Sequence, residues 1–109
     1  MVQHDDVEVV IWTGRGCGAC VQAKQFLGRK KVAFKERRLK SDAATQRAFA
    51  KATRGARTVP QIFVGQHHVG GFDDLLQMEK TGELDVLLGR AETLPSRSAV
   101  QRFLRWLGF

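Results

Sequence analysis

Cys17 and Cys20 are the two cysteines of this 109-residue chain, and they stand three positions apart in the sequence Cys-Gly-Ala-Cys. Two thiols at this spacing can exchange electrons with disulfides, or they can supply half of a metal site. A small chain that depends on disulfides for its stability carries more cysteines than two. The pair therefore indicates redox chemistry or metal binding, and not a disulfide scaffold.

The position of the pair between a strand and a helix favours redox chemistry. Residues 7–12 are rich in β-branched side chains and predict a buried strand, and residues 13–16 predict a glycine-rich turn. From Cys17 to about Gly28 the apolar residues repeat at helical spacing. Cys17 would then cap the helix, where free N–H groups stabilise an anion. Such positions lower the pKa of a cysteine thiol from about 8.5 to roughly 3.5–7.5, and the thiolate is the nucleophile.

Cys20 would lie beside Cys17 in the first helical turn, with the two Cβ atoms about 5–6 Å apart. A small rotation then closes a disulfide. We expect Cys17 to be the exposed nucleophile and Cys20 to be the more buried thiol that resolves a mixed disulfide. A zinc site would need two more ligands, and the adjacent His67 and His68 would point to opposite faces of a strand. For Cys20 alone, an ordinary core cysteine remains an open alternative.

The remaining pattern predicts the order βαβαββα. The expected elements are a strand over 32–39, a helix capped by Ser41 or Asp42 that runs to about Thr53, strands over 61–64 and 67–69, a helix from Phe72 to about Lys80, and a final turn over 83–88. A strand–helix–strand unit gives a parallel pair, and the later hairpin adds antiparallel strands. The sequence therefore predicts an α/β fold with a small mixed four-stranded sheet flanked by helices.

Two further segments could meet the thiol. Thr58-Val59-Pro60 places a proline at the start of a strand, where a cis bond would leave the Val59 backbone free to pair with a peptide-like substrate. Gly70-Gly71 precede a helix whose N–H groups could bind a carboxylate, and Asp73 could bind an ammonium group. Together they would suit an α-amino acid head group. Taken alone, each segment is equally an ordinary strand boundary or helix start.

These three elements, in this order, resemble the glutaredoxin family of the thioredoxin fold. The matching residues are 17–20, 58–65 and 70–75, and the closing segment 81–84 is also similar to the family. The resemblance covers about residues 7–88. Thioredoxins share the first two elements but not the Gly-Gly-x-Asp-Asp segment, so the resemblance points to glutaredoxins.

The resemblance implies a glutathione-dependent thiol–disulfide oxidoreductase that reduces protein–glutathione mixed disulfides and small disulfides through the Cys17 thiolate. By the same resemblance the γ-glutamyl head of glutathione would lie on Phe72 and Asp73, and its cysteinyl unit would pair with Val59. By this resemblance Arg57 is our candidate for binding the glycine carboxylate. Gly14 stands where many members carry a lysine, and Arg15 is the stand-in for that lysine. The expected glutathione-binding residues are Arg15, Arg57, Thr58, Val59, Pro60, Gly71, Phe72 and Asp73.

The alternative function is a glutathione-ligated [2Fe–2S] carrier or sensor. Family members without the proline after the nucleophile resemble those that hold such a cluster between two protomers, and Gly18 occupies that position here. Two Cys17 thiolates and two glutathione thiolates would supply the four ligands. Without a cluster we expect a monomer that binds no metal. A third reading is a protein-disulfide reductant recharged by thioredoxin reductase, against which the Asp73 site argues.

Charge is concentrated in the first half of the chain. The net charge is +7, and 13 of the 18 Lys and Arg residues lie between residues 15 and 57. This field should attract anions such as glutathione, although a solvated basic face is the plainer explanation. We expect partners to be glutathione and glutathionylated or disulfide-containing proteins, and we expect no nucleic acid.

The two ends of the chain complete the expected organisation. We assign residues 1–89 to one domain and residues 90–109 to a basic amphipathic extension, with a helix from Ser98 to Phe109 that packs on its own domain. The acidic start lacks the features of a signal peptide, and no apolar run is long enough to span a membrane. The expected location is the cytoplasm.

Overall fold

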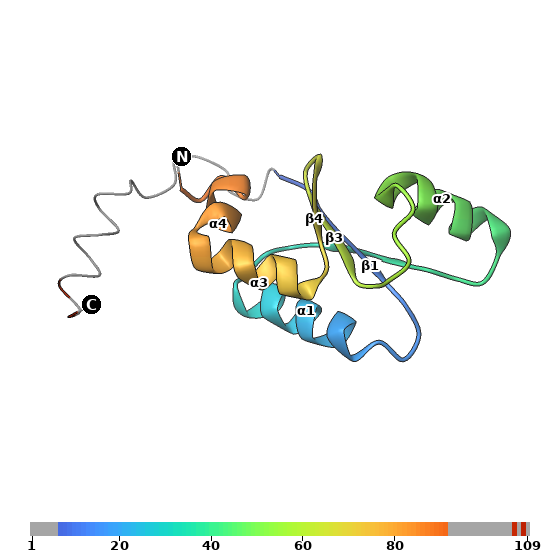
Figure 1. The fold of residues 1–109 in the computed structure, drawn as a ribbon, viewed down its shortest axis with the longest axis horizontal. Coiled ribbons are helices and arrows are strands. Elements are labelled where there is room, and N and C mark those ends of the chain that lie inside the picture. The colour runs from blue at the N-terminus through green and yellow to red at the C-terminus, as the bar shows by residue number, and fades with distance from the viewer. Residues whose placement is uncertain (1–6, 92–105, 107, 109) are drawn as a thin grey trace.

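The computed structural model describes residues 7–91, 106 and 108 (Figure 1). The elements are β1 (Val9–Thr13), α1 (Gly18–Arg29), β2 (Lys35–Arg38), α2 (Ala43–Thr53), β3 (Gln61–Val64), β4 (His67–Gly70), α3 (Phe72–Thr81) and α4 (Glu83–Leu87). The predicted order is confirmed, and the expected final turn forms the short helix α4. The helix expected from Ser98 to Phe109 lies outside the described residues, apart from Trp106 and Gly108.

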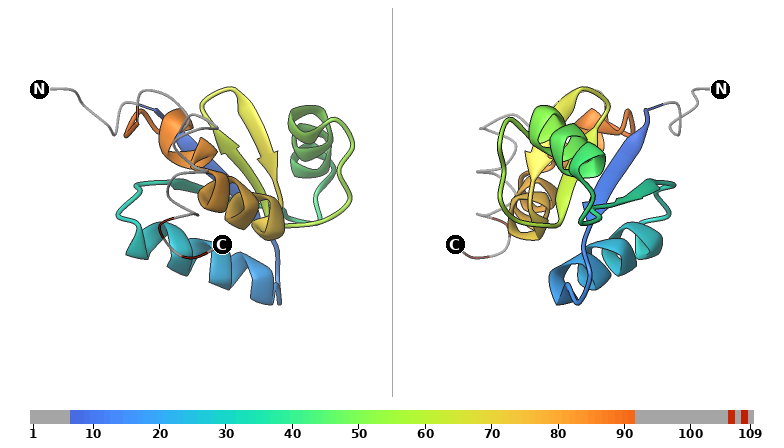
Figure 2. Two further views of the ribbon diagram at one scale, coloured as in Figure 1. Left: turned by 60° about the vertical axis from the view of Figure 1, so that its left-hand side comes forward. Right: turned by 90° about the vertical axis from the view of Figure 1, so that its right-hand side faces the viewer.

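The four strands form one mixed sheet in the order β2-β1-β3-β4. Strands β1 and β2 are parallel, whereas β3 is antiparallel to both β1 and β4. Helices α1 and α3 cover one face of the sheet and α2 lies at the other (Figures 1 and 2). This is the predicted thioredoxin-like fold. No helix in the described part of the chain is long and apolar enough to cross a membrane.

Strand β1 is packed on both faces because alternate side chains point to opposite sides. Val9 and Ile11 join the main core with side chains of α1, α3 and α4. On the other face Trp12 packs edge-to-face against Phe49 of α2, with ring centroids 5.4 Å apart. The strand leads directly into the turn before Cys17, so this packing fixes the start of the site.

One predicted boundary is wrong. The second strand spans only Lys35–Arg38, and not 32–39. Val32 is buried in the core, and its N–H donates to the Leu27 carbonyl of α1 at 2.9 Å, so it lies outside the strand. The helix predicted to run to about Gly28 ends at Arg29, and Lys31 then takes a left-handed backbone with a φ of 60°. The strand error arises because an apolar residue can mark a core contact as well as a strand.

Candidate active site

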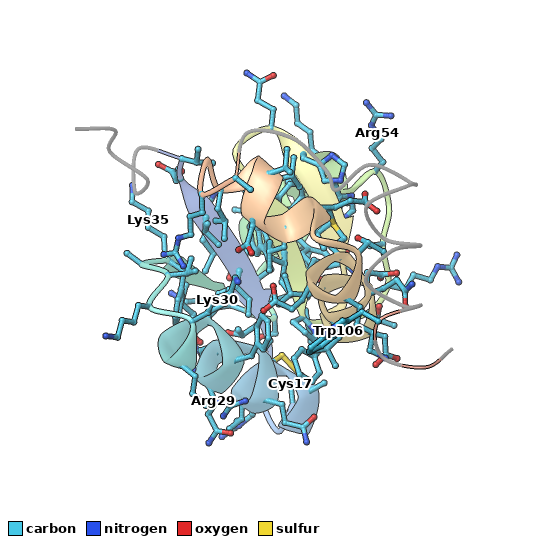
Figure 3. The ribbon with its side chains drawn as sticks, turned by 90° about the vertical axis from the view of Figure 1, so that its left-hand side faces the viewer. Cys17, Arg29, Lys30, Lys35, Arg54 and Trp106 are labelled. Carbon is cyan, nitrogen blue, oxygen red and sulfur yellow. A yellow bond between two sulfur atoms is a disulfide. The ribbon has the colours of Figure 1, made fainter. Side chains whose placement is uncertain are left out.

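Cys17 caps the N-terminus of α1, as the sequence predicts. Its backbone is extended, and its Sγ accepts a hydrogen bond from the Cys20 N–H at 3.1 Å. The first turn of the helix carries no acidic residue that would repel a negative sulfur. The free N–H groups of this turn therefore stabilise charge on Cys17. Cys17 and Cys20 are joined by a disulfide (Figure 3), with Cα atoms 5.2 Å apart.

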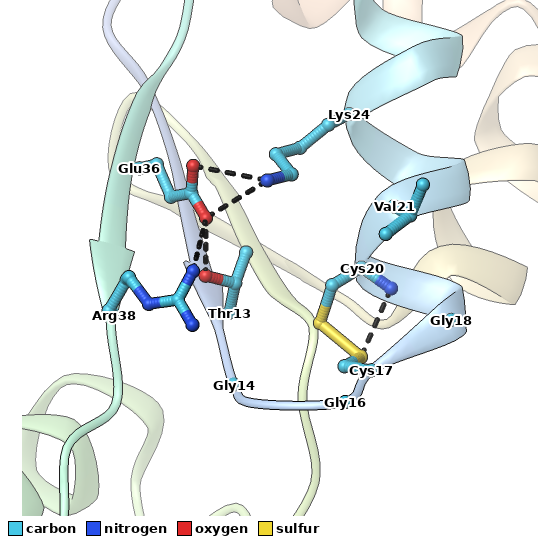
Figure 4. Close-up of a pocket in the computed structure, with 10 residues that line it drawn as sticks. All are labelled: Thr13, Gly14, Gly16, Cys17, Gly18, Cys20, Val21, Lys24, Glu36 and Arg38. Atoms are coloured by element: carbon cyan, nitrogen blue, oxygen red, sulfur yellow. Dashed lines mark hydrogen bonds and ion pairs between the residues drawn. A yellow bond between two sulfur atoms is a disulfide. The ribbon is translucent and has the colours of Figure 1, made fainter.

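The two sulfurs differ in exposure. Cys20 is only 2% exposed, and it shares the buried face of α1 with Ala23 and Leu27. Cys17 is partly exposed and lines a hollow of about 410 Å³ that opens toward β2 (Figure 4). The expected order of burial is therefore observed. An incoming disulfide can approach Cys17 and not Cys20.

An ionic cluster lines the same hollow. The Glu36 carboxylate on β2 accepts a hydrogen bond from the buried Thr13 hydroxyl at 2.6 Å and pairs with Lys24 Nζ at 3.1 Å (Figure 4). The hydrogen bond from Thr13, followed by that from Lys24, holds the pKa of Glu36 below its ordinary value. The cluster ties together β1, α1 and β2 behind the disulfide. Sequence reasoning missed it, and the one available signal was an isolated acid in a basic run.

A second hollow of about 280 Å³ lies toward β3 and α3. It is lined by Ala19, Gln22, Thr58, Val59, Pro60, Gly71, Phe72, Asp73 and Asp74. Six of the eight residues predicted to bind glutathione are therefore brought together here. Gln22, on the second turn of α1, was not predicted, because a lone glutamine on an exposed helix face gives no signal.

The loop before β3 connects this hollow to the thiol. The Val59–Pro60 peptide is cis, and Cys17 Sγ lies 3.5 Å from the Val59 carbonyl oxygen. The buried Gln61 holds the loop from behind: its Nε2 donates to the Thr58 carbonyl at 3.1 Å, and its Oε1 lies 2.6 Å from Nε2 of His68. The Val59 backbone thus faces Cys17 from a fixed position.

The start of α3 explains why residue 70 is a glycine. Asp74 Oδ2 accepts a hydrogen bond from the Gly71 N–H at 2.9 Å. Gly70 has a φ of 113°, and a Cβ there would come within 2.5 Å of the same carboxylate oxygen. The backbone conformation of Gly70 and its contact with Asp74 therefore account for glycine at this position. Asp73, the next acid, is exposed and has no partner within the described residues, so its carboxylate is available to a ligand.

The two predicted arginines lie outside this hollow. Arg57 is exposed on the loop before Thr58, whereas Arg15 lines a separate hollow with Arg38 and Lys40. Gly14 is held as glycine by packing, because a Cβ at this position would lie 2.9 Å from Val59 Cγ2. A longer side chain therefore has no room here unless Val59 shifts.

The described side chains form no cluster of metal ligands. Across residues 7–91, 106 and 108, no three His, Cys, Asp or Glu residues are grouped as metal ligands. The [2Fe–2S] alternative would use Cys17 from two protomers together with glutathione. It is not tested by one chain and stays a prediction.

Comparison with known proteins agrees with this geometry. Residues 9–69 match the Glutaredoxin family model. A glutaredoxin from Pseudomonas aeruginosa is 47% identical over 81 residues, which cover 73% of this chain and 94% of that protein.

Solved structures show the same relationship. The solution structure of a glutaredoxin from Brucella melitensis has a TM-score of 0.66 and 40% identity, over 79% of this chain and 92% of that one. The crystal structure of a buckwheat glutaredoxin–glutathione complex has a TM-score of 0.65 and 26% identity, over 79% and 80% of the two chains. Because the family match contains the Cys17–Cys20 pair and the cis-proline loop, this chain belongs to the glutaredoxin family and is a thiol–disulfide oxidoreductase.

Proposed function

We propose that this oxidoreductase uses glutathione to reduce protein–glutathione mixed disulfides and small disulfides. Glutaredoxins use glutathione as a co-substrate. The observation that carries the proposal is the hollow that joins the Val59 carbonyl, 3.5 Å from Cys17 Sγ, to the carboxylate of Asp73, which is exposed and has no partner among the described residues. A tripeptide with a thiol in its middle and an ammonium at one end matches that arrangement.

In the first step the Cys17 thiolate attacks the glutathione sulfur of the substrate. The substrate S–S bond breaks, the protein sulfur leaves with the electron pair and takes a proton, and a Cys17–glutathione disulfide forms. The N–H groups at the start of α1 stabilise the thiolate before attack, and the Cys20 N–H donates a hydrogen bond to Cys17 Sγ at 3.1 Å. A carboxylate near the thiolate would repel its negative charge, and the first turn of α1 contains no acidic residue.

Two routes then release the enzyme. A second glutathione thiolate can attack the glutathione sulfur, which yields glutathione disulfide and frees Cys17. Alternatively, Cys20 attacks Cys17 Sγ, releases glutathione and forms the Cys17–Cys20 disulfide that the structure contains. Two glutathione molecules then reduce that disulfide. Because Cys20 is buried, its reaction is confined to Cys17.

The hollow orients glutathione through both ends and the middle. We assign its ammonium group to Asp73, its γ-glutamyl carboxylate to the N-terminus of α3 beside Phe72, and its cysteinyl backbone to Val59. The glycine carboxylate is assigned to Arg57, because Arg57 directly precedes Thr58 of the hollow, whereas Arg15 lies toward β2. A reducing compartment such as the cytoplasm suits this chemistry.

The choice of reductant tests the proposal. Oxidised protein is mixed with a glutathionylated peptide and NADPH in two separate reactions. The first contains glutathione and glutathione reductase, and the second contains thioredoxin reductase in their place. We expect NADPH consumption only in the glutathione mixture, and none when Cys17→Ser replaces the wild type. Equal turnover with thioredoxin reductase alone would contradict glutathione dependence and would support the protein-disulfide reductant instead.

A further inference from the structure

We propose that a basic groove along β2 docks an acidic segment of the protein whose cysteine is glutathionylated. The proposal rests on the proposed function, since it concerns the protein half of that substrate. The β2 groove is the surface between Cys17 and α2 that carries Arg15, Arg37, Arg38 and Lys40. It lies on the β2 side of Cys17, away from the hollow assigned to glutathione.

Three hollows adjoin to form the β2 groove. The first, of about 410 Å³, contains Cys17; the second, of about 530 Å³, contains Arg15 and Lys40; the third, of about 420 Å³, contains Arg37 and reaches α2. Arg38 lines all three, so the hollows meet at its side chain on the edge of the sheet. A polypeptide bound at Cys17 could therefore continue along the groove without leaving the surface.

The cations of the groove are available to a partner. Arg15 and Lys40 are exposed and make no ion pair with the described residues, and the Arg38 side chain is 58% exposed with only a loose contact to Glu36 at 3.9 Å. Arg37 lies over the Trp12 ring, 4.6 Å from its centroid, on an exposed strand.

The acids near the groove are already engaged. The carboxylate of Glu36 is held by the Thr13 hydroxyl and by Lys24. The Asp42 carboxylate, which feels the charge of Lys40, caps α2 through Thr45. The groove therefore presents a surplus of positive charge next to the reactive disulfide, which favours an acidic partner.

The frame that holds these cations is fixed by hydrogen bonds. The Leu39 N–H donates to the Thr13 carbonyl at 2.7 Å, and Gln46 Nε2 donates to the Lys40 carbonyl at 2.6 Å. Because the backbone is held at both points, binding would order side chains and not the loop. A preorganised surface of this kind loses less entropy when a partner binds.

A polypeptide fits this surface better than a nucleic acid does. Single-stranded nucleic acids bind through exposed aromatic rings on which bases stack. The aromatic ring of this groove, Trp12, is only 2% exposed and lies beneath Arg37. Among the described strands, β2 lies at the edge of the sheet and pairs with β1 alone, so its outer backbone can bond to an extended peptide.

The test compares two glutathionylated peptides that differ only near the modified cysteine, where one carries Asp and Glu and the other Asn and Gln. The ratio of the two kcat/KM values is measured for three proteins: wild type, R38Q/K40Q and the control R29Q/K80Q. The control removes two exposed charges at the far ends of α1 and α3. Because each protein is its own reference on the neutral peptide, changes in glutathione handling cancel.

We expect wild type and the control to prefer the acidic peptide by about three- to tenfold at low salt. R38Q/K40Q should lose most of that preference, and high salt should remove it from all three proteins. Equal loss in R29Q/K80Q would mean that net charge and not the groove is responsible. A wild type without preference would overturn the groove while leaving the proposed function intact.

Two further outcomes separate the proposals. If neither peptide is reduced while a small glutathione mixed disulfide is, the failure lies in the proposed action on glutathionylated proteins. The last outcome compares two competitors for reduction of the acidic glutathionylated peptide: a short single-stranded oligonucleotide and the same peptide without glutathione. If the oligonucleotide inhibits more strongly and R38Q/K40Q removes its inhibition, the groove binds nucleic acid and the polypeptide assignment is wrong.

Discussion

The contact between Gly14 and Val59 gives a direct test of how the cis-proline loop is positioned. A Cβ at Gly14 would lie 2.9 Å from Val59 Cγ2, well inside the usual carbon–carbon separation of about 3.5–4.0 Å. Gly14 does not have a positive φ, so alanine is compatible with its backbone. Because valine is stiff at χ1, we expect the clash to be relieved by a shift of the Val59 backbone, whose carbonyl faces Cys17.

The expected energies have opposite signs in two backgrounds. Overpacking costs about 1–3 kcal/mol, whereas Gly→Ala at a compatible site stabilises a protein by about 0.4–1 kcal/mol through the unfolded chain. Gly14→Ala should therefore lower the free energy of unfolding by about 1 kcal/mol in the wild type. In the Val59→Ala background, which lacks Cγ2, the same change should raise the free energy of unfolding by about 0.4–1 kcal/mol.

Urea unfolding of the four oxidised proteins in this double-mutant cycle measures the coupling. The matched control is Gly18→Ala, because a Cβ at Gly18 meets nothing within 4 Å. This control should change stability equally in both backgrounds. Gly14→Ala should also raise the KM for glutathione, and this rise should be smaller in the Val59→Ala background. Any change in KM caused by Gly18→Ala should be the same in both backgrounds. Equal destabilisation by Gly14→Ala with and without Val59 Cγ2 would refute the steric argument.

Three further predictions concern the ligand, the fold and the cluster. Asp73→Ala should raise the KM for glutathione by about tenfold or more, because loss of a charged hydrogen bond costs about 1.5–3 kcal/mol, and unchanged kinetics would place the ammonium elsewhere. Lys30, whose side chain is 15% exposed, pairs with Glu79 at 2.9 Å and Asp85 at 2.7 Å, and Lys30→Met should lower the free energy of unfolding by about 1–2 kcal/mol. Burial lowers the pKa of Lys30, but the bonds to Asp85 and Glu79 outweigh this effect and raise its pKa. The difference in the free energy of unfolding between wild type and Lys30→Met should therefore be complete below about pH 10.4 and decrease as the pH rises further. A difference that grows at alkaline pH would contradict this sign. Reconstitution with iron, sulfide and glutathione should give a coloured dimer if the [2Fe–2S] alternative holds, and assembly of the same cluster by Cys17→Ser would show that the proposed ligation is wrong.

Local patterns predicted the parts of the site that depend on neighbouring residues. The capping position of Cys17 follows from a strand, a glycine-rich turn and a helix in sequence, and the structure confirms it. The approach of Thr58-Val59-Pro60 and Phe72-Asp73 followed from the family resemblance together with these patterns. The capping position is encoded within a few residues, so a single sequence is enough to find it, whereas the meeting of the two later segments was predicted with the help of the family resemblance.

Contacts between distant polar side chains could not be predicted in this way. The Thr13–Glu36–Lys24 cluster joins three elements, and the Glu36 carboxylate meets a hydroxyl 23 positions away. The separation of Arg15 from the glutathione hollow likewise depends on which side of Cys17 the turn faces. Such contacts are decided by sheet order and packing, which local periodicity does not specify.

The central claim is that Cys17 alone attacks the substrate and Cys20 acts only on Cys17. Its most direct test is the rate at which Cys17→Ser and Cys20→Ser reduce a glutathionylated peptide and, separately, a protein disulfide, with glutathione as reductant. Because Cys17 is partly exposed at the helix start and Cys20 is 2% exposed, Cys17→Ser should abolish both reactions. Cys20→Ser should retain turnover of the glutathionylated peptide and lose direct reduction of the protein disulfide. Equal loss of peptide turnover in the two variants would contradict the assignment of Cys17 as the sole nucleophile.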